Sequence, residues 1–451
     1  MRKISFILVS FSFLLFNIQL SAQNIIGSSD SKTPISIKET MEDLTFDLSF
    51  DFLSLQTINT QNGLFSQLDM GKDFGHNQKV GYPKLPIYYE FIEIPFGANF
   101  EIEYNNIVKE SYSLNQYGGY KLIPVQKSIS KNDTSTTFYL DKDVYNSDKF
   151  FGDELVNVEI IGFMGGVRLA RLSISPIKYN PVSNSIEIIR SANIKIKFLN
   201  ADIQKTISLK QIYNNQQSKL LKDELINPKN ISATTFSAPI NRPLKMIILS
   251  DAMFEEALQP FIRWKREKGF EIIELYKGQS SIGTTTTSMK AYLQSLWDNA
   301  SIESPFADYL LICGDIEQIP AFDATTIYDT PTDLYYAEYT GDILPDVFYG
   351  RFSVQTVEQM NSIINKTIAY EKYLMQDTSY LKKTLLVAGS DRSWTTNNNG
   401  QMNYLKQYLI NNNSTDTLVY YNPSSEQFST KIRDSISRNG YSLITYSAHC
   451  A

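Results

Sequence analysis

The sequence predicts a multidomain protein in which an all-β, sandwich-like domain precedes an α/β domain with a mostly parallel sheet covered by helices. Two compositional patterns support this fold class. Up to about residue 238, segments rich in β-branched and aromatic residues alternate with turn-forming clusters. From Leu244 onward, continuous apolar segments alternate with amphipathic helical ones, which is typical of parallel strands buried on both faces. With 451 residues and 42% hydrophobic content, the chain can bury more than one core.

Residues 1–22 predict an export signal. Arg2 and Lys3 precede the apolar run "ISFILVSFSFLLFNIQL", and the small residues of "LSAQ" follow, so we expect cleavage between Ala22 and Gln23. Polar residues interrupt this run, which is shorter than the ~20 apolar residues needed to cross a bilayer. We therefore expect a secreted or cell-surface protein with no transmembrane segment after signal removal.

Residues 23–238 are expected to form the β-rich domain and the linker that follows it. The turns are expected in "GYPKLP" and "YNPVSNS", and the polar stretch "NPKNISATTFSAPINRP" indicates an exposed connection. His76, in the polar segment "GKDFGHNQ", is expected to be a solvated loop residue. The expected strands are "LTFDLSFDFLSL", "YYEFIEIPF", "FEIEYNNIV", "VRLARLSIS" and "IEIIRSANIKIKFLN".

Residues 239–451 are expected to form the α/β domain, incomplete at its C-terminus. Its strands are expected in "LKMIILS", "DYLLIC", "DVFYGRFS", "KTLLVAG", "TLVYY" and "YSLITYS". Helices are expected in "AMFEEALQPFIRWKREKG", "TTTSMKAYLQSLWDN", "TVEQMNSIINKTIAYEKYL", around "MNYLKQYLI", and in "SEQFSTKIRDSIS".

Composition excludes several classes of function. A net charge of -6 argues against a nucleic-acid partner, because phosphate binding needs clustered cations. Two cysteines, Cys313 and Cys450, provide no disulfide framework, and two histidines exclude a His-rich metal site. The glycine segments "VAGSDR" and "GFMGGV" lack the spacing of nucleotide-binding loops, so no organic cofactor is expected.

Three polar residues follow predicted strands and are candidates for a site. Asp315, Asp391 and His449 come after "YLLIC", "LLVAGS" and "SLITYSA", and parallel strands present such ends at one sheet edge. A histidine and a carboxylate there could act as a base and its orienting partner. The alternatives are a helix cap or turn for each aspartate, and a structural role for the histidine.

The segments "YLLICGDIEQIPA", "TDLYY", "DVFYGRFS" and "ITYSAHCA" resemble landmarks of gingipain-type cysteine peptidases, which are relatives of the caspases. Upstream, "GYPKLPIYYEFIEIPFGANFEIE" is similar to the pro-domain of that family. The resemblance implies a cysteine endopeptidase that hydrolyses protein or peptide substrates through a thioester. It also implies a zymogen whose own pro-domain is an intramolecular inhibitor. Lys222, Lys229 and Arg242 lie in or beside the exposed connection and are candidate cleavage points, and the alternative is an ordinary surface segment with scattered cations.

The resemblance implies that His449 is the catalytic histidine and that Asp391 assists it. In the family the nucleophilic cysteine follows on the next strand, so we expect it downstream of residue 451. Cys450 does not replace it, because adjacent residues of an extended chain project to opposite sides. Cys313, inside an apolar strand, is expected to be a small buried hydrophobic residue.

A structural calcium site is a further expectation. Asp315, Asp342 and Asp346 lie in "CGDIEQ" and "TGDILPD", and carboxylates suit calcium, a hard cation that takes 6–8 oxygen ligands. The resemblance implies calcium at matching positions, although two further family ligands fall near Gln401 and Lys406, and a lysine does not bind a cation. The alternative is a set of solvated turn aspartates.

Two rival functions stay open. One is the sortase-like peptidase of the type IX secretion pathway, whose machinery is also an expected partner for export. The other is a catalytically inactive adhesin or binding protein on the same scaffold, which the alanine at 448 and the cysteine at 450 favour, because the family has glycines there.

Overall fold

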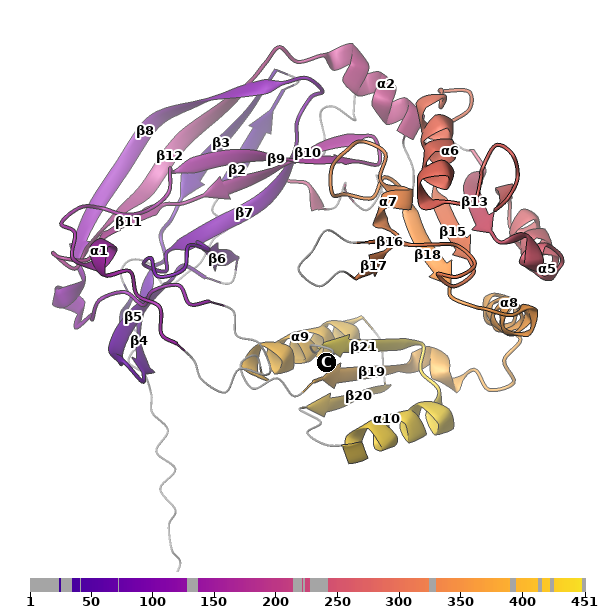
Figure 1. The fold of residues 1–451 in the computed structure, drawn as a ribbon. Helices are drawn as coiled ribbons and strands as arrows, with labels where there is room; N and C mark the ends of the chain where they lie inside the picture. Colours follow the sequence, from indigo (N-terminus) through magenta and orange to yellow (C-terminus); the bar gives the residue numbers. More distant parts are fainter. Residues whose placement is uncertain are drawn as a thin grey trace, which may run out of the picture.

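The computed structural model consists of a β-rich N-terminal domain followed by an α/β domain (Figure 1). This order confirms the predicted fold class. Within the described ranges, no helix is long and apolar enough to cross a membrane. The structure describes residues 24–25, 35–40, 42–71, 73–127, 137–213, 221, 224–227, 242–323, 330–389, 395–412, 416–421 and 426–447.

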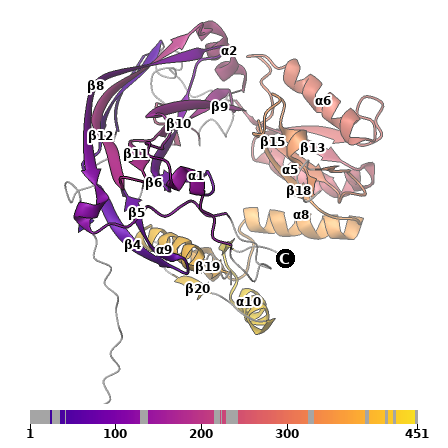
Figure 2. The ribbon, with the colours of Figure 1, turned by 60° about the vertical axis from the view of Figure 1, so that its left-hand side comes forward.

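The N-terminal domain is a sandwich of two antiparallel sheets, as its described residues show (Figures 1 and 2). Phe46 and Ile194 from one sheet share a core with Ile92 and Leu172 from the other, and all four side chains are buried. One sheet has the order β11-β12-β3-β2 with β8 also pairing β12, the other has the order β6-β7-β10-β9, and a smaller sheet has the order β1-β4-β5. The bounds of these strands are β1 Asn24–Ile25, β2 Ile35–Glu39, β3 Asp43–Ser49, β4 Ser54–Thr60, β5 Gly63–Asp69, β6 Phe74–His76, β7 Pro86–Glu93, β8 Asn99–Ser113, β9 Val156–Met164, β10 Val167–Ile174, β11 Ile177–Asn180 and β12 Ser185–Leu199.

Helices α1 Lys142–Tyr145 and α2 Ile203–Tyr213 belong to this domain. Helix α2 is held on the sandwich by a buried ion pair in which Lys210 donates to Glu93 of β7 at 2.7 Å. Asn227 then binds the backbone of Glu93 through two hydrogen bonds, of 2.8 and 2.9 Å. Asn227, the first residue of the predicted connection, is therefore anchored on the sandwich.

The α/β domain begins with a parallel sheet of order β14-β13-β15-β18. The central strand β13 is apolar and buried along nearly its whole length, because helices cover both faces of the sheet. Helices α5 and α8 pack on one face with Ile248 and Cys313, and α6 and α7 pack on the other with Ile247 and Leu249. These elements are β13 Leu244–Ser250, α5 Glu255–Glu267, β14 Phe270–Tyr276, α6 Thr286–Asp298, β15 Tyr309–Cys313, α7 Leu334–Ala337, β18 Phe348–Phe352 and α8 Val357–Glu371, with a small hairpin of β16 Phe322–Asp323 and β17 Pro331–Thr332.

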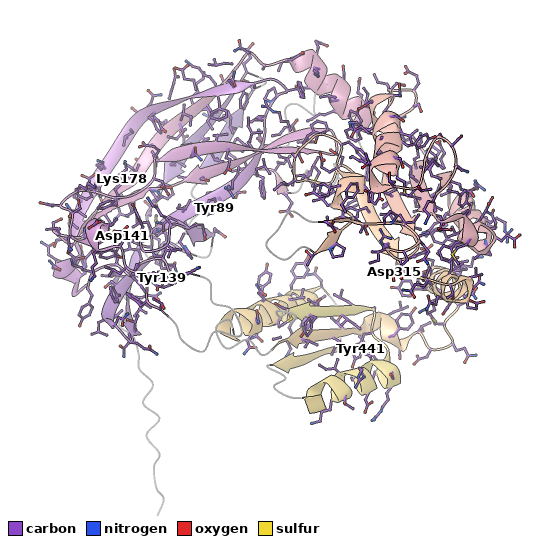
Figure 3. All side chains as sticks on the ribbon, in the orientation of Figure 1. Tyr89, Tyr139, Asp141, Lys178, Asp315 and Tyr441 are labelled. Atoms are coloured by element: carbon purple, nitrogen blue, oxygen red, sulfur yellow. The ribbon has the colours of Figure 1, made fainter. Side chains whose placement is uncertain are left out.

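The remaining strands form a second parallel sheet of order β20-β19-β21. Our expectation that all the parallel strands share one sheet edge was wrong, and Figure 3 shows Asp315 on the first sheet and Tyr441 beside the second. Apolar strand sequences carry no information about which strand they pair with, so the sequence could not separate the two sheets. The elements are β19 Lys383–Ala388, α9 Thr395–Asn411, β20 Asp416–Tyr421, α10 Glu426–Asn439 and β21 Leu443–Ser447.

Three local expectations also differ from the structure. The segment "LTFDLSFDFLSL" forms two strands, β3 and β4, in different sheets. His76 ends strand β6 and is half-buried, with burial lowering its pKa, so it is not a solvated loop residue. The sequence analysis missed the edge strand β14, whose sequence FEIIELY includes two glutamates and is neither continuously apolar nor strictly alternating.

Arg351 of β18 connects the loops at the carboxyl edge of the first sheet. Its guanidinium donates to both carboxylate oxygens of Asp333, at 2.8 and 2.6 Å, and to the carbonyls of Gly314 and Ile319, both at 2.8 Å. The Arg351 side chain is mostly buried, so water has little access to replace its hydrogen bonds. The four acceptor oxygens therefore depend on this one planar guanidinium.

We expect Arg351→Lys to lower the free energy of unfolding of the α/β domain by about 3 kcal/mol, because an ammonium group cannot replace the forked contacts. Arg438→Lys is the matched control, since Arg438 makes an exposed pair with Asp434 on α10, and its cost should stay below about 0.5 kcal/mol. Urea unfolding followed by circular dichroism measures both. Equal costs would show that the Arg351 network is not stabilising.

Candidate active site

The carboxyl ends of β19 and β21 lie side by side. Ala388 pairs with Ser447 in parallel register, and the backbone N–H of Gly389 donates to the carbonyl of Ser447 at 2.8 Å. Helix α9 supports this point, because the Ser447 hydroxyl donates to Gln401 Oε1 at 2.9 Å and lies 3.4 Å from Asn398 Oδ1. The two strand ends are thus fixed to each other and to α9.

His449 and Asp391 follow these two strand ends but lie outside the described residues, as does Cys450. Their roles and their mutual contact stay predictions. Sequence analysis considered Gln401 only as a metal ligand. Nothing in the sequence indicated that the Gln401 amide would accept a hydrogen bond from Ser447, at the end of the strand that leads to His449.

Cys313 is at the end of β15 and has no exposed surface. It packs with Phe254, Phe261 and Met360 from the helices on that face. Burial raises the pKa of its thiol, because a thiolate there would lose its hydration. Since the thiolate is the reactive form, Cys313 is unsuited to be a nucleophile, and the expectation that it is a buried hydrophobic residue is confirmed.

Asp315 has a structural position at the edge of the first sheet. Its carboxylate accepts hydrogen bonds from Gln355 Nε2 at 2.9 Å, from the N–H of Ile316 at 2.9 Å and from Ser353 Oγ at 3.0 Å. These bonds, with that from Gln355 the largest contribution, lower the pKa of Asp315. Asp315 therefore joins the ends of β15 and β18, and it lies on a different sheet from the strands that precede Asp391 and His449.

Asp342 and Asp346 lie in the loop before β18 and have different surroundings. Asp342 accepts hydrogen bonds from the backbone N–H of Leu344 at 2.7 Å and from that of Phe163, in the N-terminal domain, also at 2.7 Å. Asp346 is buried and accepts from the N–H of Tyr339 at 2.6 Å. Burial, the largest cause, raises the pKa of Asp346 to about 8.

Among the described residues, no group of three or more His, Cys, Asp or Glu side chains is arranged to hold a metal ion. Asp315, Asp342 and Asp346 are each engaged by the hydrogen-bond donors described above. Calcium binding stays a prediction, and no chemical step below depends on it.

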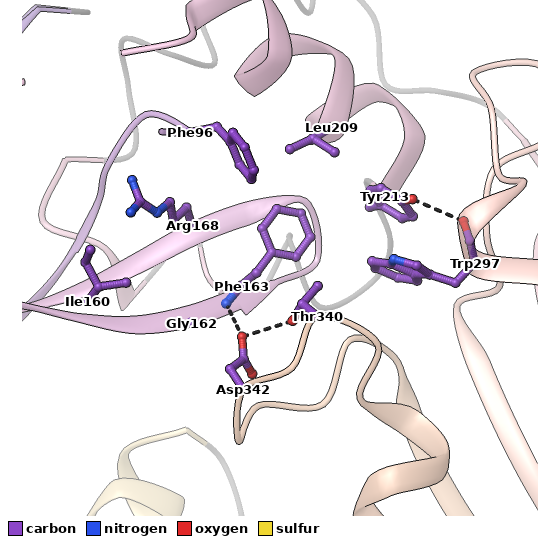
Figure 4. A pocket seen from close by; sticks show the side chains of 10 residues that line it. All are labelled: Phe96, Ile160, Gly162, Phe163, Arg168, Leu209, Tyr213, Trp297, Thr340 and Asp342. Atoms are coloured by element: carbon purple, nitrogen blue, oxygen red, sulfur yellow. Dashed lines mark hydrogen bonds between the residues drawn. The ribbon is translucent and has the colours of Figure 1, made fainter. Parts of the chain in front are cut away.

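A cavity of about 320 Å³ lies where the two domains meet (Figure 4). It is largely apolar and is lined by residues of both domains. None of these residues belongs to the second sheet, so the cavity is separate from the strand ends that precede Asp391 and His449. Sequence analysis did not anticipate it, because its residues are distant in the chain. The lining residues are Phe96, Ile160, Gly162, Phe163, Arg168, Leu209, Tyr213, Trp297, Thr340 and Asp342.

Comparison with family models gives two matches that together cover most of the chain. Residues 240–451 match peptidase family C25, and residues 30–225 match the C25 propeptide. Arg242, the next described residue after Asn227, lies near the start of the peptidase match, and Asn227 lies just after the propeptide match.

Individual relatives come from Porphyromonas gingivalis. Lys-gingipain HG66 is 31% identical over 431 residues, which are 94% of this chain and 25% of the relative. Gingipain R2 is 22% identical over 90% of this chain and 53% of its own length. A solved structure concerned with the zymogenic latency of gingipain K is 29% identical, with a TM-score of 0.37 over 40% of this chain and 100% of that one. The present chain spans about a quarter of the length of the Lys-gingipains it matches.

Because Cys313 is buried, we expect iodoacetamide to leave it unmodified in the folded Cys450→Ser variant and to modify it fully in concentrated guanidinium. Mass spectrometry of the peptide containing Cys313 measures the modified fraction. Rapid labelling in the folded state would contradict the burial of this thiol.

Proposed function

The chain belongs to peptidase family C25 and carries the propeptide of that family, and from this premise we propose that it forms part of the zymogen of an exported cysteine endopeptidase. The observation that carries the proposal is the order of the two matches, with propeptide before peptidase along one chain. The predicted signal at residues 1–22 supports export, with the secretion machinery as a transient partner. Proteins or peptides are the proposed substrates.

In the proposed reaction, His449 takes the proton of a cysteine thiol and the thiolate attacks the carbonyl carbon of the scissile peptide bond. His449 then gives the proton to the departing amine, and water hydrolyses the thioester to release the acid. Asp391 would hold the second ring nitrogen of His449 and fix its tautomer. The adjacent ends of β19 and β21 support this assignment, because Asp391 and His449 follow them closely in sequence.

The proposed nucleophile is a cysteine outside residues 1–451. Burial argues against Cys313, and the opposite projection of neighbouring residues in an extended chain argues against Cys450. The thiol must reach within ~2.6–3.2 Å of the His449 imidazole, or slightly farther in a resting enzyme.

The N-terminal sandwich is the proposed inhibitor, and cutting the connection between the two domains is the proposed step that allows it to leave the α/β domain. Lys222 and Lys229 lie outside the described residues. Arg242 donates to the buried carboxylate of Asp308 at 3.0 and 3.3 Å, so cleavage after Arg242 would require breaking this pair. We therefore favour a cleavage point before Arg242.

Replacing His449 with Ala in the complete, activated precursor is expected to lower kcat/KM for peptide hydrolysis by at least about 10²-fold, because the base is removed. Asp391→Asn should cause a smaller loss, since it acts on the orientation of the ring. Fluorogenic peptides of varied sequence provide the assay, and Cys313→Ala is the matched control with unchanged kcat/KM.

Full activity of His449→Ala would reject this base. If the wild-type protein binds peptides without cleaving them under any activating condition, the chain is instead a binding protein on a peptidase scaffold.

A further inference from the structure

Phe163 of the N-terminal domain is inserted into the core of the α/β domain. Its side chain is only 8% exposed, although it lies beside the turn of the β9–β10 hairpin. The Phe163 ring contacts Trp297 of α6 edge to face, with ring centroids 6.4 Å apart and planes at 89°. It belongs to the same apolar cluster as Phe306 and Tyr339, whose rings also pack against Trp297.

The local backbone of the hairpin explains this orientation. Gly165 and Gly166 form the turn and both have positive φ, which suits a two-residue hairpin. Strand β9 contains a bulge at Ile161, since Gly162 pairs with Leu169 whereas Ile160 pairs with Ala170. The bulge reverses the alternation of the strand and places Phe163 opposite Arg168, on the face of the hairpin that also carries Ile160 and Ala170. At the tip of the hairpin this face meets the other domain, where Phe163 contacts Trp297.

The α/β domain presents a carboxylate, that of Asp342, to a backbone N–H of the hairpin. Asp342 accepts the backbone N–H of Phe163 at 2.7 Å and also the hydroxyl of Thr340 at 3.0 Å (Figure 4). A Cβ atom at residue 162 would lie 2.6 Å from the carboxyl carbon of Asp342, so a larger residue there would force the carboxylate to shift from its position at the Phe163 N–H. Glycine followed by an aromatic residue is therefore the combination that fits.

Two neighbouring contacts extend the same surface. Tyr213 at the end of α2 stacks on Trp297, with centroids 3.8 Å apart, and donates to the Trp297 carbonyl at 3.1 Å. Trp297 thus lies between Tyr213 and Tyr339. On the other side of Asp342, Leu344 packs against an apolar cluster of the N-terminal domain that includes Val167.

We infer that the face formed by Trp297, Tyr339 and Asp342 is a docking site for a glycine–aromatic β-hairpin, which Gly162–Phe163 fills in the intact chain. This contact, and not the covalent connection, keeps the N-terminal domain on the α/β domain. The inference deepens the proposed function, because a zymogen whose connection is cut would still need this site to be vacated. It concerns a face different from the strand ends of the second sheet.

The test uses the full chain with the recognition sequence of a site-specific protease inserted between Pro228 and Asn241. After the cut, gel filtration over a dilution series measures the concentration at which the two parts separate. We expect Phe163→Ala and Gly162→Ala to separate at concentrations on the order of 100-fold higher than the wild type, because each variant disrupts the inserted hairpin. Phe150→Ala is the matched control, since Phe150 is 39% exposed and does not line the interdomain cavity.

A synthetic peptide of residues 156–174, closed by an added disulfide between its ends and verified as a hairpin by circular dichroism, provides a second measurement that does not depend on folding of a variant. In excess it should displace the N-terminal domain from the cut wild-type chain, whereas the same peptide with Phe163→Ala should not. Unchanged separation of both variants, no displacement by the peptide, or immediate separation of the cut wild type would each overturn the inference. Because none of these readouts requires peptidase activity, failure of the docking site and failure of the proposed function can be distinguished.

Discussion

Parallel pairing of strands is the constraint on which the candidate site depends. When β19 and β21 pair in parallel, the residues that follow them must leave from the same edge of the sheet, however far apart they are in sequence. The hydrogen bond from Gly389 to Ser447 marks this edge, and Gln401 of α9 holds the Ser447 side chain. In the first sheet, too, the residues that follow parallel strands leave from one edge. There, hydrogen bonds of Asp315 and Arg351 join the loops to one another.

Cys313 illustrates how burial decides the role of a side chain, because a cysteine peptidase needs a reactive thiolate and a buried thiol stays protonated. The end of a parallel strand is a suitable position for a catalytic thiol. Cys313, however, packs against the helices that cover the sheet, and burial raises the pKa of its thiol. Asp346 shows the same effect on a carboxyl group. In both cases desolvation disfavours the charged form, so residue type and strand position alone do not identify a reactive group.

The boundary between the two domains has features of a core as well as of an interface. Phe163 and Tyr213 pack against Trp297 as core aromatic residues do, whereas Asp342 recognises a backbone N–H across the boundary. The sandwich has its own apolar core, and α2 is fixed to it by the Lys210–Glu93 pair. The two domains therefore have separate cores and share one aromatic cluster.

The sequence by itself determined the class and order of the domains, because alternating and continuous apolar segments have different periodicities and can be read locally. It also predicted the burial of Cys313 from the apolar strand around it. Only the tertiary structure decided that β19 and β21 lie in a second sheet, that Asp315 joins the ends of β15 and β18, and that Phe163 leaves its own domain to contact Trp297. These features depend on strand pairing and on contacts between residues distant in the sequence, from 38 positions for Asp315 and Ser353 to more than a hundred for Phe163 and Trp297. Such partners leave no periodic pattern in a single sequence.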